Sequence, residues 1–140
     1  NIENDEIKFK GFIDGIIGDT DKRGKKRIWI IDWKTAGPGG WRLNKKRDFL
    51  TQAQLAAYKI YWSRREEIDL KDIRCAFVLL KRESKPGKSI SIVPVSVGPK
   101  MVQKTDKLVH SMLKSVRRKM HLKNKESCRF CEFKGTEHCK

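Results

Sequence analysis

Apolar residues along the chain gather into short runs that polar turns separate, and this pattern predicts alternating strands and helices. The runs at 7–17 and 27–34 flank a polar turn at 18–26, which predicts an antiparallel β-hairpin near the N-terminus. The runs at 73–82 and 89–97 flank a Lys-Pro-Gly-Lys turn and predict a second pair of strands.

Two other segments repeat their apolar residues at helical spacing. The segment 48–65 carries such a face, made of Leu50, Ala53, Ala57 and Ile60. The segment 100–122 carries a longer one, and a loop rich in glycine and proline at 36–46 precedes the first helix. The order strand, strand, helix, strand, strand, helix predicts the α/β class, with a central mixed sheet flanked by helices.

Asp14 and Asp32 are isolated acids inside the apolar stretches of the predicted hairpin. A carboxylate beside a hydrophobic core costs free energy unless it is paired or binds a metal. Because side chains alternate along a strand, Asp32 and Lys34 point to one face of the sheet while Trp33 points to the other. If the two strands are neighbours, Asp14 faces Asp32 across the hairpin. Two carboxylates and one ammonium group then converge at a sheet edge.

Such a group has the chemistry of phosphoryl transfer. Carboxylate and carbonyl oxygens suit Mg²⁺, which activates water and neutralises charge on a phosphoryl group. A lysine beside the ion, here Lys34, orients or deprotonates that water. The alternative is a surface Asp–Lys pair at the strand ends, with Asp14 in a turn.

The first predicted helix adds a polar pair. Gln54 and Tyr58 are four residues apart and therefore share one face of the helix. Small alanines flank them, so the helix can pack closely on the sheet and bring the amide and the phenol to its active edge. The alternative places Tyr58 in the core and Gln54 in solvent.

Charge narrows the class of partner. The chain has 140 residues, and 33 Lys and Arg against 17 Asp and Glu give a formal net charge of +16. Such a balance favours a polyanion, nucleic acid before an anionic membrane surface. No apolar run approaches the ~20 residues of a membrane span and no secretory signal opens the chain, which predicts an intracellular protein without a membrane partner. Because the first residue is Asn1 rather than Met, we expect a fragment or a processed or trimmed chain.

Basic segments supply the candidate contacts to nucleic acid. The candidates are Trp41, Arg42, Lys45, Lys46, Arg117 and Arg118. The first four lie in or after the glycine-rich loop, where an aromatic ring beside cations suits base stacking next to phosphate contacts. The last two lie in the second predicted helix. The alternatives are that Trp41 closes the edge of the core and that the helix shows a solvated basic face.

Three of the four cysteines gather near the end of the chain, at Cys128, Cys131 and Cys139. In a reduced compartment, clustered thiols favour metal binding over disulfides. The Cys-x-x-Cys spacing lets two thiolates reach one ion from a tight turn, and His138 completes a zinc set of three cysteines and one histidine. The alternative is three free thiols.

The ordered motifs together resemble the RecB-type branch of the PD-(D/E)XK nuclease superfamily. That branch shows G-x-x-D on one strand, D-x-K-T on the next and Q-x-x-x-Y on the following helix, and these patterns stand here at 11–14, 32–35 and 54–58. The resemblance implies a restriction-endonuclease-like core.

The resemblance also implies roles for the candidate residues. Asp14, Asp32 and the backbone carbonyl of Trp33 would ligate Mg²⁺ or Mn²⁺. Lys34 would be the catalytic lysine. The residues of the helix motif, Gln54 and Tyr58, would support the site or contact DNA.

The tail is similar to that of AddB-type and CRISPR adaptation nucleases of the same branch. There a C-x-x-C pair and a third cysteine join one upstream to hold a [4Fe–4S] cluster. The resemblance implies a nuclease core at 1–125 and a cysteine-rich tail at 126–140, in which Cys128, Cys131 and Cys139 hold such a cluster, with zinc as the competing metal.

The expected activity is hydrolysis of phosphodiester bonds in DNA by a metal-activated water. Exonuclease action on single strands or free ends is favoured, because the enzymes it resembles resect ends in DNA repair and recombination. A helicase or a replication or recombination protein is left open as partner. The first alternative is a non-catalytic DNA-binding module with this fold, because the family usually has an acid or histidine on a helix before the first strand, where this chain has only 1–6. The second is a basic zinc-binding adaptor.

Overall fold

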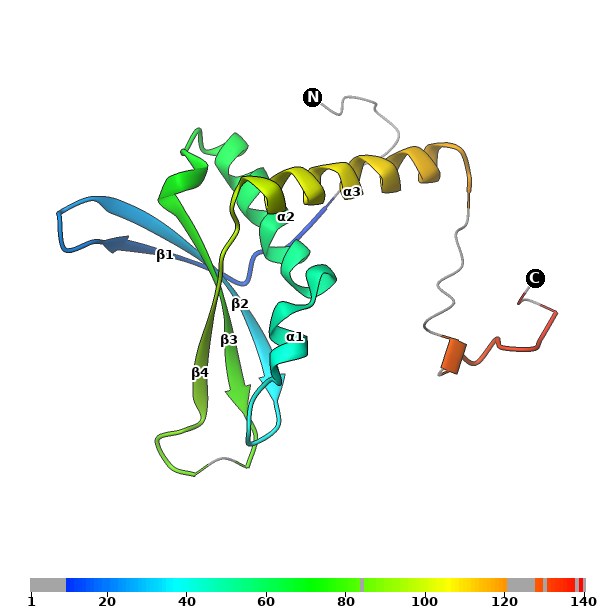
Figure 1. Cartoon of the computed structure of the whole chain (residues 1–140), viewed down its shortest axis with the longest axis horizontal. Helices are drawn as coiled ribbons and strands as arrows, with labels where there is room; N and C mark the ends of the chain where they lie inside the picture. Colours follow the sequence, from blue (N-terminus) through cyan, green and yellow to red (C-terminus); the bar gives the residue numbers. More distant parts are fainter. Residues whose placement is uncertain (1–9, 84, 121–127, 130, 138, 140) are drawn as a thin grey trace.

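The computed structural model describes residues 10–83, 85–120, 128–129, 131–137 and 139 of the chain. It contains a four-stranded sheet with helices packed against it (Figure 1). The strands are β1 (Gly15–Thr20), β2 (Lys26–Ala36), β3 (Ile73–Lys81) and β4 (Ile90–Val95). The helices are α1 (Leu43–Arg47), α2 (Phe49–Arg65) and α3 (Pro99–Arg117), with a 3₁₀ turn η1 at Leu70–Asp72.

The strands lie in the order β1-β2-β3-β4 and form a mixed sheet. The hairpin β1–β2 is antiparallel, β2–β3 is parallel, and β3–β4 is antiparallel. A parallel pair requires a crossover, and α2 supplies it by returning the chain across β2 and β3, while α3 packs on α2 (Figure 1). This arrangement confirms the predicted α/β class with a central mixed sheet and flanking helices.

The core lies between α2 and the two central strands. Ile30 of β2, Phe77 of β3 and Leu55 of α2 are fully buried and belong to one cluster. Asp48 caps the start of α2, because its carboxylate accepts the N–H of Thr51 at 2.7 Å. The core and this cap fix α2 over the face of the sheet to which Ile30 points.

The opposite face of the sheet is partly exposed among the described residues. Ile31, Ala76 and Val78 are buried there. Five other apolar side chains on this face keep exposed fractions between 42% and 65%: Ile17, Trp33, Leu80, Ile90 and Ile92. Strand alternation places them away from the face that carries Ile30 and Phe77. The helices of the described part include none that is long and apolar enough to cross a membrane.

The first strand is shorter than the sequence pattern predicts. β1 begins at Gly15 rather than near residue 7 and runs on to Thr20, into the expected turn. Ahead of it, the carboxylate of Asp14 accepts the N–H of Trp33 at 2.8 Å, in the place of a ladder bond between the strands. The backbone at Gly11 instead lies against the ring of Tyr58 on α2, so the chain leaves the sheet before Asp14.

Two further element boundaries and the burial of one residue differ from what the sequence predicts. The segment expected as a loop at 36–46 ends in the short helix α1, which has no apolar spacing to reveal it. Leu50, expected on the buried face of α2, is 66% exposed in the first turn of that helix. α3 ends at Arg117 rather than at 122, and Lys119 follows with a positive φ of 54°, a conformation that a helix excludes.

Candidate active site

The hairpin brings Asp14 and Asp32 to opposite positions. Gly15 pairs with Ile31 in the antiparallel register, so the next step of the same register sets Asp14 opposite Asp32. Opposed residues of an antiparallel pair project to the same face, with Cβ atoms ~5 Å apart. The two carboxylates therefore share the face that α2 covers, with Asp14 at the exposed end and Asp32 buried.

Asp32 is a buried carboxylate with an incomplete set of partners. Only 2% of it is exposed, and this burial raises its pKa above the ordinary value, while the Lys34 ammonium opposes the rise and the charge of Asp14 adds to it. Lys34 Nζ lies 2.8 Å from Asp32 Oδ2 as an ion pair. The ammonium of Lys34 is the only polar partner of Oδ2 among the described residues. A second cation beside this buried carboxylate would stabilise its charge further.

A chain of polar contacts runs from β2 to α2. Lys34 Nζ donates a hydrogen bond to Gln54 Oε1 at 3.2 Å, and Gln54 Nε2 donates to the hydroxyl of Tyr58 at 3.1 Å. The four-residue spacing of Gln54 and Tyr58 puts both on the face of α2 that meets β2. The lysine is thereby held between Asp32 and the amide, and the orientation of that amide follows from its two partners.

The oxygen atoms at this position fit a hard divalent cation. Asp14 and Asp32 offer carboxylate oxygens, and the backbone carbonyl of Trp33 lies between Asp32 and Lys34 in the chain. Mg²⁺ and Mn²⁺ take such ligands, and the burial of Asp32 with one ammonium group as its partner supports the fit. Within the described residues no three His, Cys, Asp or Glu side chains gather to hold a metal. An ion here would therefore keep several water ligands, as Mg²⁺ usually does.

The basic loop between β2 and α2 lies at the edge of the core. Trp41 is half-buried, and its ring centroid lies 5.1 Å from that of the buried Phe77. The ring therefore closes the edge of the core, which is the alternative to base stacking that the sequence also allowed. Lys45 lies over the Trp41 ring at 5.8 Å and donates to Thr51 at 2.9 Å. Arg42 and Lys45 are exposed and Lys46 is half-buried.

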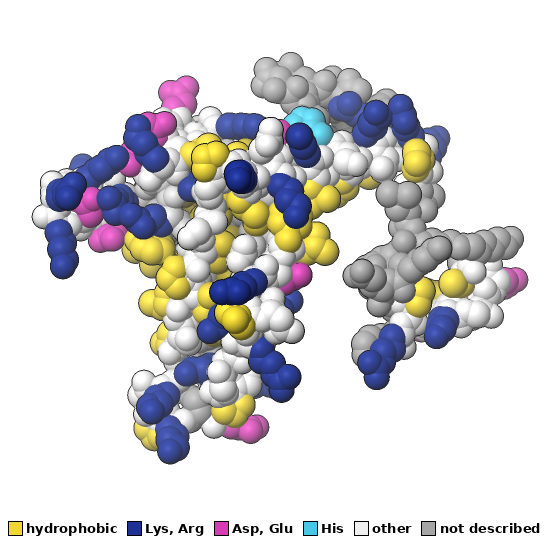
Figure 2. Space-filling model, in the orientation of Figure 1, with side chains coloured by type: hydrophobic (Ala, Val, Ile, Leu, Met, Phe, Trp, Pro, Cys, Tyr) yellow, Lys and Arg dark blue, Asp and Glu magenta, His cyan; other side chains and the backbone are white. Residues whose placement is uncertain are grey.

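The other basic pair lies far from the carboxylates. Arg117 ends α3 and Arg118 follows it, at the end of the helix that extends away from the sheet (Figure 1). Both are exposed. Lys and Arg side chains are spread over the visible surface, including the tip of the β1–β2 hairpin and the β3–β4 turn (Figure 2). The structure therefore offers a broad basic surface in which Arg117 and Arg118 are one outlying part.

The described cysteines are free thiols. Cys128 is half-buried, Cys131 and Cys139 are exposed, and no group of three metal-ligating side chains forms among the described residues. His138, the proposed fourth zinc ligand, lies outside the described part of the chain. Cys75 is buried in β3, and this burial raises the pKa of its thiol to about 11. The structure thus does not assemble the tail cysteines into a metal site.

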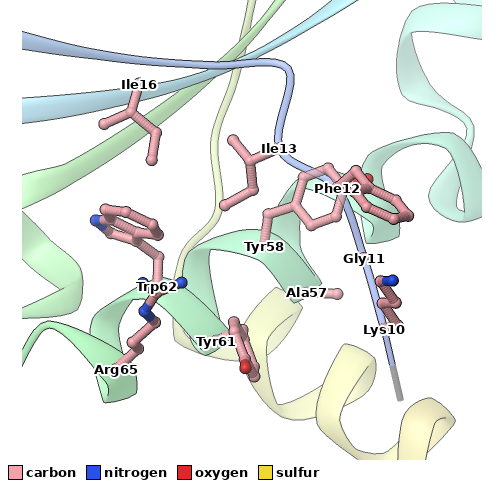
Figure 3. A pocket seen from close by; sticks show the side chains of 10 residues that line it. All are labelled: Lys10, Gly11, Phe12, Ile13, Ile16, Ala57, Tyr58, Tyr61, Trp62 and Arg65. Carbon is pink, nitrogen blue, oxygen red and sulfur yellow. The ribbon is translucent and has the colours of Figure 1, made fainter. Parts of the chain in front are cut away.

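Sequence reasoning missed an aromatic face on α2. Tyr58, Tyr61, Trp62 and Arg65 stand at positions i, i+3, i+4 and i+7, a helical spacing that marks one face. They line a cavity together with the segment that precedes β1 (Figure 3). The spacing was visible in the sequence, but the opposing wall comes from a segment more than 40 residues away, and only the fold brings the two together.

Comparison with known proteins assigns the family. A model of the PD-(D/E)XK nuclease superfamily matches residues 2–136, which include the sheet, α2 and the residues of the carboxylate site. No curated protein and no solved structure matches the chain. Proteins of this superfamily are typically metal-dependent phosphodiesterases that act on nucleic acids. By the extent of this match, and with the mixed sheet that such a core requires, the chain belongs to the PD-(D/E)XK nuclease superfamily.

Proposed function

We propose that this chain hydrolyses phosphodiester bonds of DNA with Mg²⁺ or Mn²⁺ held by Asp14, Asp32 and the carbonyl of Trp33. The observation that carries the proposal is the buried Asp32, whose Oδ2 has Lys34 at 2.8 Å as its only polar partner among the described residues and which lies opposite Asp14. A purely structural ion pair gains little from burial, because desolvation offsets the Coulombic attraction. A site that receives a cation explains why the chain keeps this carboxylate buried.

The residues of the chain divide the work around the scissile phosphate. A divalent ion at this position supplies charge neutralisation and an activated water. Asp32 and Asp14 set the place of the ion. Lys34, fixed by Asp32 and Gln54, directs an N–H toward the attacking water or a phosphate oxygen. Gln54 and Tyr58 hold that lysine in position through their hydrogen bond.

Exonuclease action on single strands or free ends is the finer part of the proposal. It rests on the likeness of the three motifs to the RecB-type branch, whose members resect DNA from ends.

A cleavage assay with matched substrates tests both the nuclease activity and the exonuclease assignment. Linear single-stranded, linear duplex and closed circular DNA of one sequence are incubated with Mg²⁺, with Mn²⁺ or with EDTA. We expect metal-dependent degradation of linear DNA, fastest for the single strand, while the circle persists. Metal-dependent opening of the circle would support a nuclease but contradict the exonuclease assignment. Intact DNA in every metal would contradict the proposed function.

A non-catalytic DNA-binding module is the second candidate. The observation that favours it is that only two acidic side chains, Asp14 and Asp32, stand at the site within the described residues. A binding module of this kind would retain DNA equally well with EDTA and with Mg²⁺ and would release no product. The same substrates in a binding assay without turnover therefore separate the two functions.

The cysteine tail supports a separate proposal, a [4Fe–4S] or zinc knot that fastens the C-terminus. The Cys-x-x-Cys spacing of Cys128 and Cys131 favours it. The described thiols do not come together as a ligand set, so we assign the knot no part in the reaction. Iron, sulfide and zinc analysis of anaerobically purified protein decides the matter. Absence of all three would leave three free thiols.

A further inference from the structure

A cavity of about 370 Å³ lies between α2 and the segment that precedes β1 (Figure 3). One wall is the aromatic face of α2, and the other is the chain from Lys10 to Ile16. The volume is within the range of sites that hold small organic groups, roughly 300–1,000 Å³. Gly11 forms part of the wall directly, because a Cβ there would lie 2.8 Å from a ring carbon of Tyr58.

The walls combine open ring surface with positive charge. Phe12 is 71% exposed and Tyr61 is 58% exposed, which are large fractions for aromatic side chains. Lys10 Nζ lies 4.8 Å from the centroid of the Phe12 ring, and the Arg65 guanidinium lies 5.4 Å from that of Trp62. Each cation therefore lies beside an aromatic ring that lines the cavity. A ligand that stacks on these rings and carries a negative charge could contact Lys10 or Arg65 as well.

Two direct connections join this cavity to the carboxylate site. Phe12 and Ile13 come immediately before Asp14 in the chain. On the other wall, Tyr58 lines the cavity with its ring and accepts the hydrogen bond of Gln54 with its hydroxyl, and Gln54 accepts that of Lys34. A group held in the cavity is thus adjacent to the position where Asp14 and Lys34 meet a phosphate.

We propose that the cavity holds an unpaired base of single-stranded DNA next to the scissile phosphate, with the flanking phosphates near Lys10 and Arg65. The inference rests on the proposed nuclease function and locates where a single-stranded substrate is held beside the carboxylate site. Aromatic rings beside cations bind single strands because every base has a face that stacks and every nucleotide carries a phosphate. A duplex hides those faces in its own stack and presents only base edges in its grooves. The cavity therefore selects single strands over duplex.

Equilibrium binding in EDTA, where no cleavage occurs, measures the selection. The ligands are one fluorescent single strand, its blunt duplex and an abasic strand of the same length. The variants are Tyr61→Ala and Phe12→Ala, which remove exposed rings of the cavity outside the carboxylate site. The matched control is Ile92→Ala, which truncates a 65% exposed apolar side chain on β4. Melting curves establish that each variant is folded.

We expect each cavity variant to bind the single strand about tenfold more weakly, the loss that one stacked base gives, and to bind the duplex and the abasic strand as the wild type does. Ile92→Ala should bind all three ligands unchanged. A third variant, Arg65→Gln, should lower the slope of log K against log salt on the single strand by ~0.7, one phosphate contact.

Three results would overturn the inference. The first is an equal loss of affinity for all three ligands, which would show that the cavity residues contribute to DNA binding without contacting a base. The second is no loss on any. The third is a wild-type dimer in light scattering that Tyr61→Ala dissociates, which would assign the cavity to a second copy of the chain. Cleavage in Mg²⁺ is measured in parallel with binding. If the cavity variants lose base-dependent binding but the wild type does not cleave DNA, the nuclease assignment is wrong and the cavity assignment stands. If the wild type cleaves DNA but the cavity variants bind all ligands normally, the cavity assignment is wrong and the nuclease assignment stands.

Discussion

Lys34 Nζ lies 2.8 Å from the carboxylate of Asp32, two residues earlier on β2, and donates at 3.2 Å to Gln54 on α2. Strand alternation makes the first contact possible, since residues two apart share a face. The second depends on the packing of α2 over the sheet. The lysine is therefore held by one local and one tertiary contact. Any change in how α2 packs on the sheet alters the position of its ammonium group.

The burial of Asp32 has a consequence for stability. Its folded-state pKa stands above the ordinary 3.8, while the unfolded chain titrates near that value. Between the two values the folded protein binds more protons than the unfolded one, so the free energy of unfolding decreases as pH rises through this window. We expect Asp32→Asn to remove that decrease, so that in EDTA the variant gains stability relative to the wild type as pH rises from 3.8 through the raised pKa of Asp32.

Thermal melts of both proteins across this pH range measure the effect. The other shifted carboxyls are the same in both proteins and cancel in the difference; the pKa of Asp48, for example, is lowered by its hydrogen bonds with Thr51. Added Mg²⁺ should stabilise the wild type and leave Asp32→Asn unchanged. Parallel curves for the two proteins would show that Asp32 is not a destabilised carboxylate.

Two glycines of β1 provide a matched pair. A Cβ on Gly15 would lie 2.8 Å from the side chain of Ile31, whereas a Cβ on Gly18 meets no atom within 4 Å. We expect Gly15→Ala to lower the free energy of unfolding by about 1–3 kcal/mol through overpacking. Gly18→Ala should leave it unchanged or raise it by up to about 1 kcal/mol. Equal effects in urea unfolding would contradict the register of the hairpin beside Asp14.

Thiol reactivity reports on the core and the tail together. We expect iodoacetamide to modify Cys131 and Cys139 first and Cys128 next, because they are exposed or half-buried. Cys75 should react only after unfolding, because its burial and a pKa of about 11 leave little thiolate at neutral pH. Peptide mass spectrometry resolves the four sites. Tail thiols that react only after chelation would support the metal knot, and modification of native Cys75 would contradict its place in the core.

DNA binding should depend steeply on salt. Each phosphate contact contributes a slope of roughly −0.7 to −0.9 in log K against log salt, and the basic surface offers several. We expect Arg42→Gln, at an exposed position before α1, to reduce the slope by about one contact. Lys71→Gln is the control, since Lys71 pairs with Asp69 away from the loop. A slope near zero for the wild type would contradict an electrostatic interface.

Much of the carboxylate site is predictable because it is local in sequence. Asp32 and Lys34 share a face by alternation, Gln54 and Tyr58 share one by helical spacing, and Asp14 stands out as an isolated acid just before β1. Contacts between these pairs are not local. The hydrogen bond of Lys34 with Gln54 exists because α2 crosses back over β2, and no spacing along the chain encodes its length.

The parts that sequence reasoning missed have a common cause. β1 starts late because the Asp14 carboxylate takes the N–H of Trp33 and Gly11 packs on Tyr58, both contacts between segments distant in the chain. The cavity has the same origin, since each wall looks like an ordinary helix or strand by itself. Trp41 reads as an exposed ring beside cations, and only the fold reveals Phe77 behind it.

The most direct test of the account is the rate of Mg²⁺-dependent cleavage of single-stranded DNA by Asp32→Asn and Lys34→Ala. Their controls are Asp69→Asn and Lys71→Ala, an exposed acid and lysine that pair with each other. We predict that both site variants lose at least about 100-fold in rate while remaining folded and binding DNA, and that both controls match the wild type. Full activity in Asp32→Asn would contradict the assignment of the buried carboxylate and its lysine as the nuclease site.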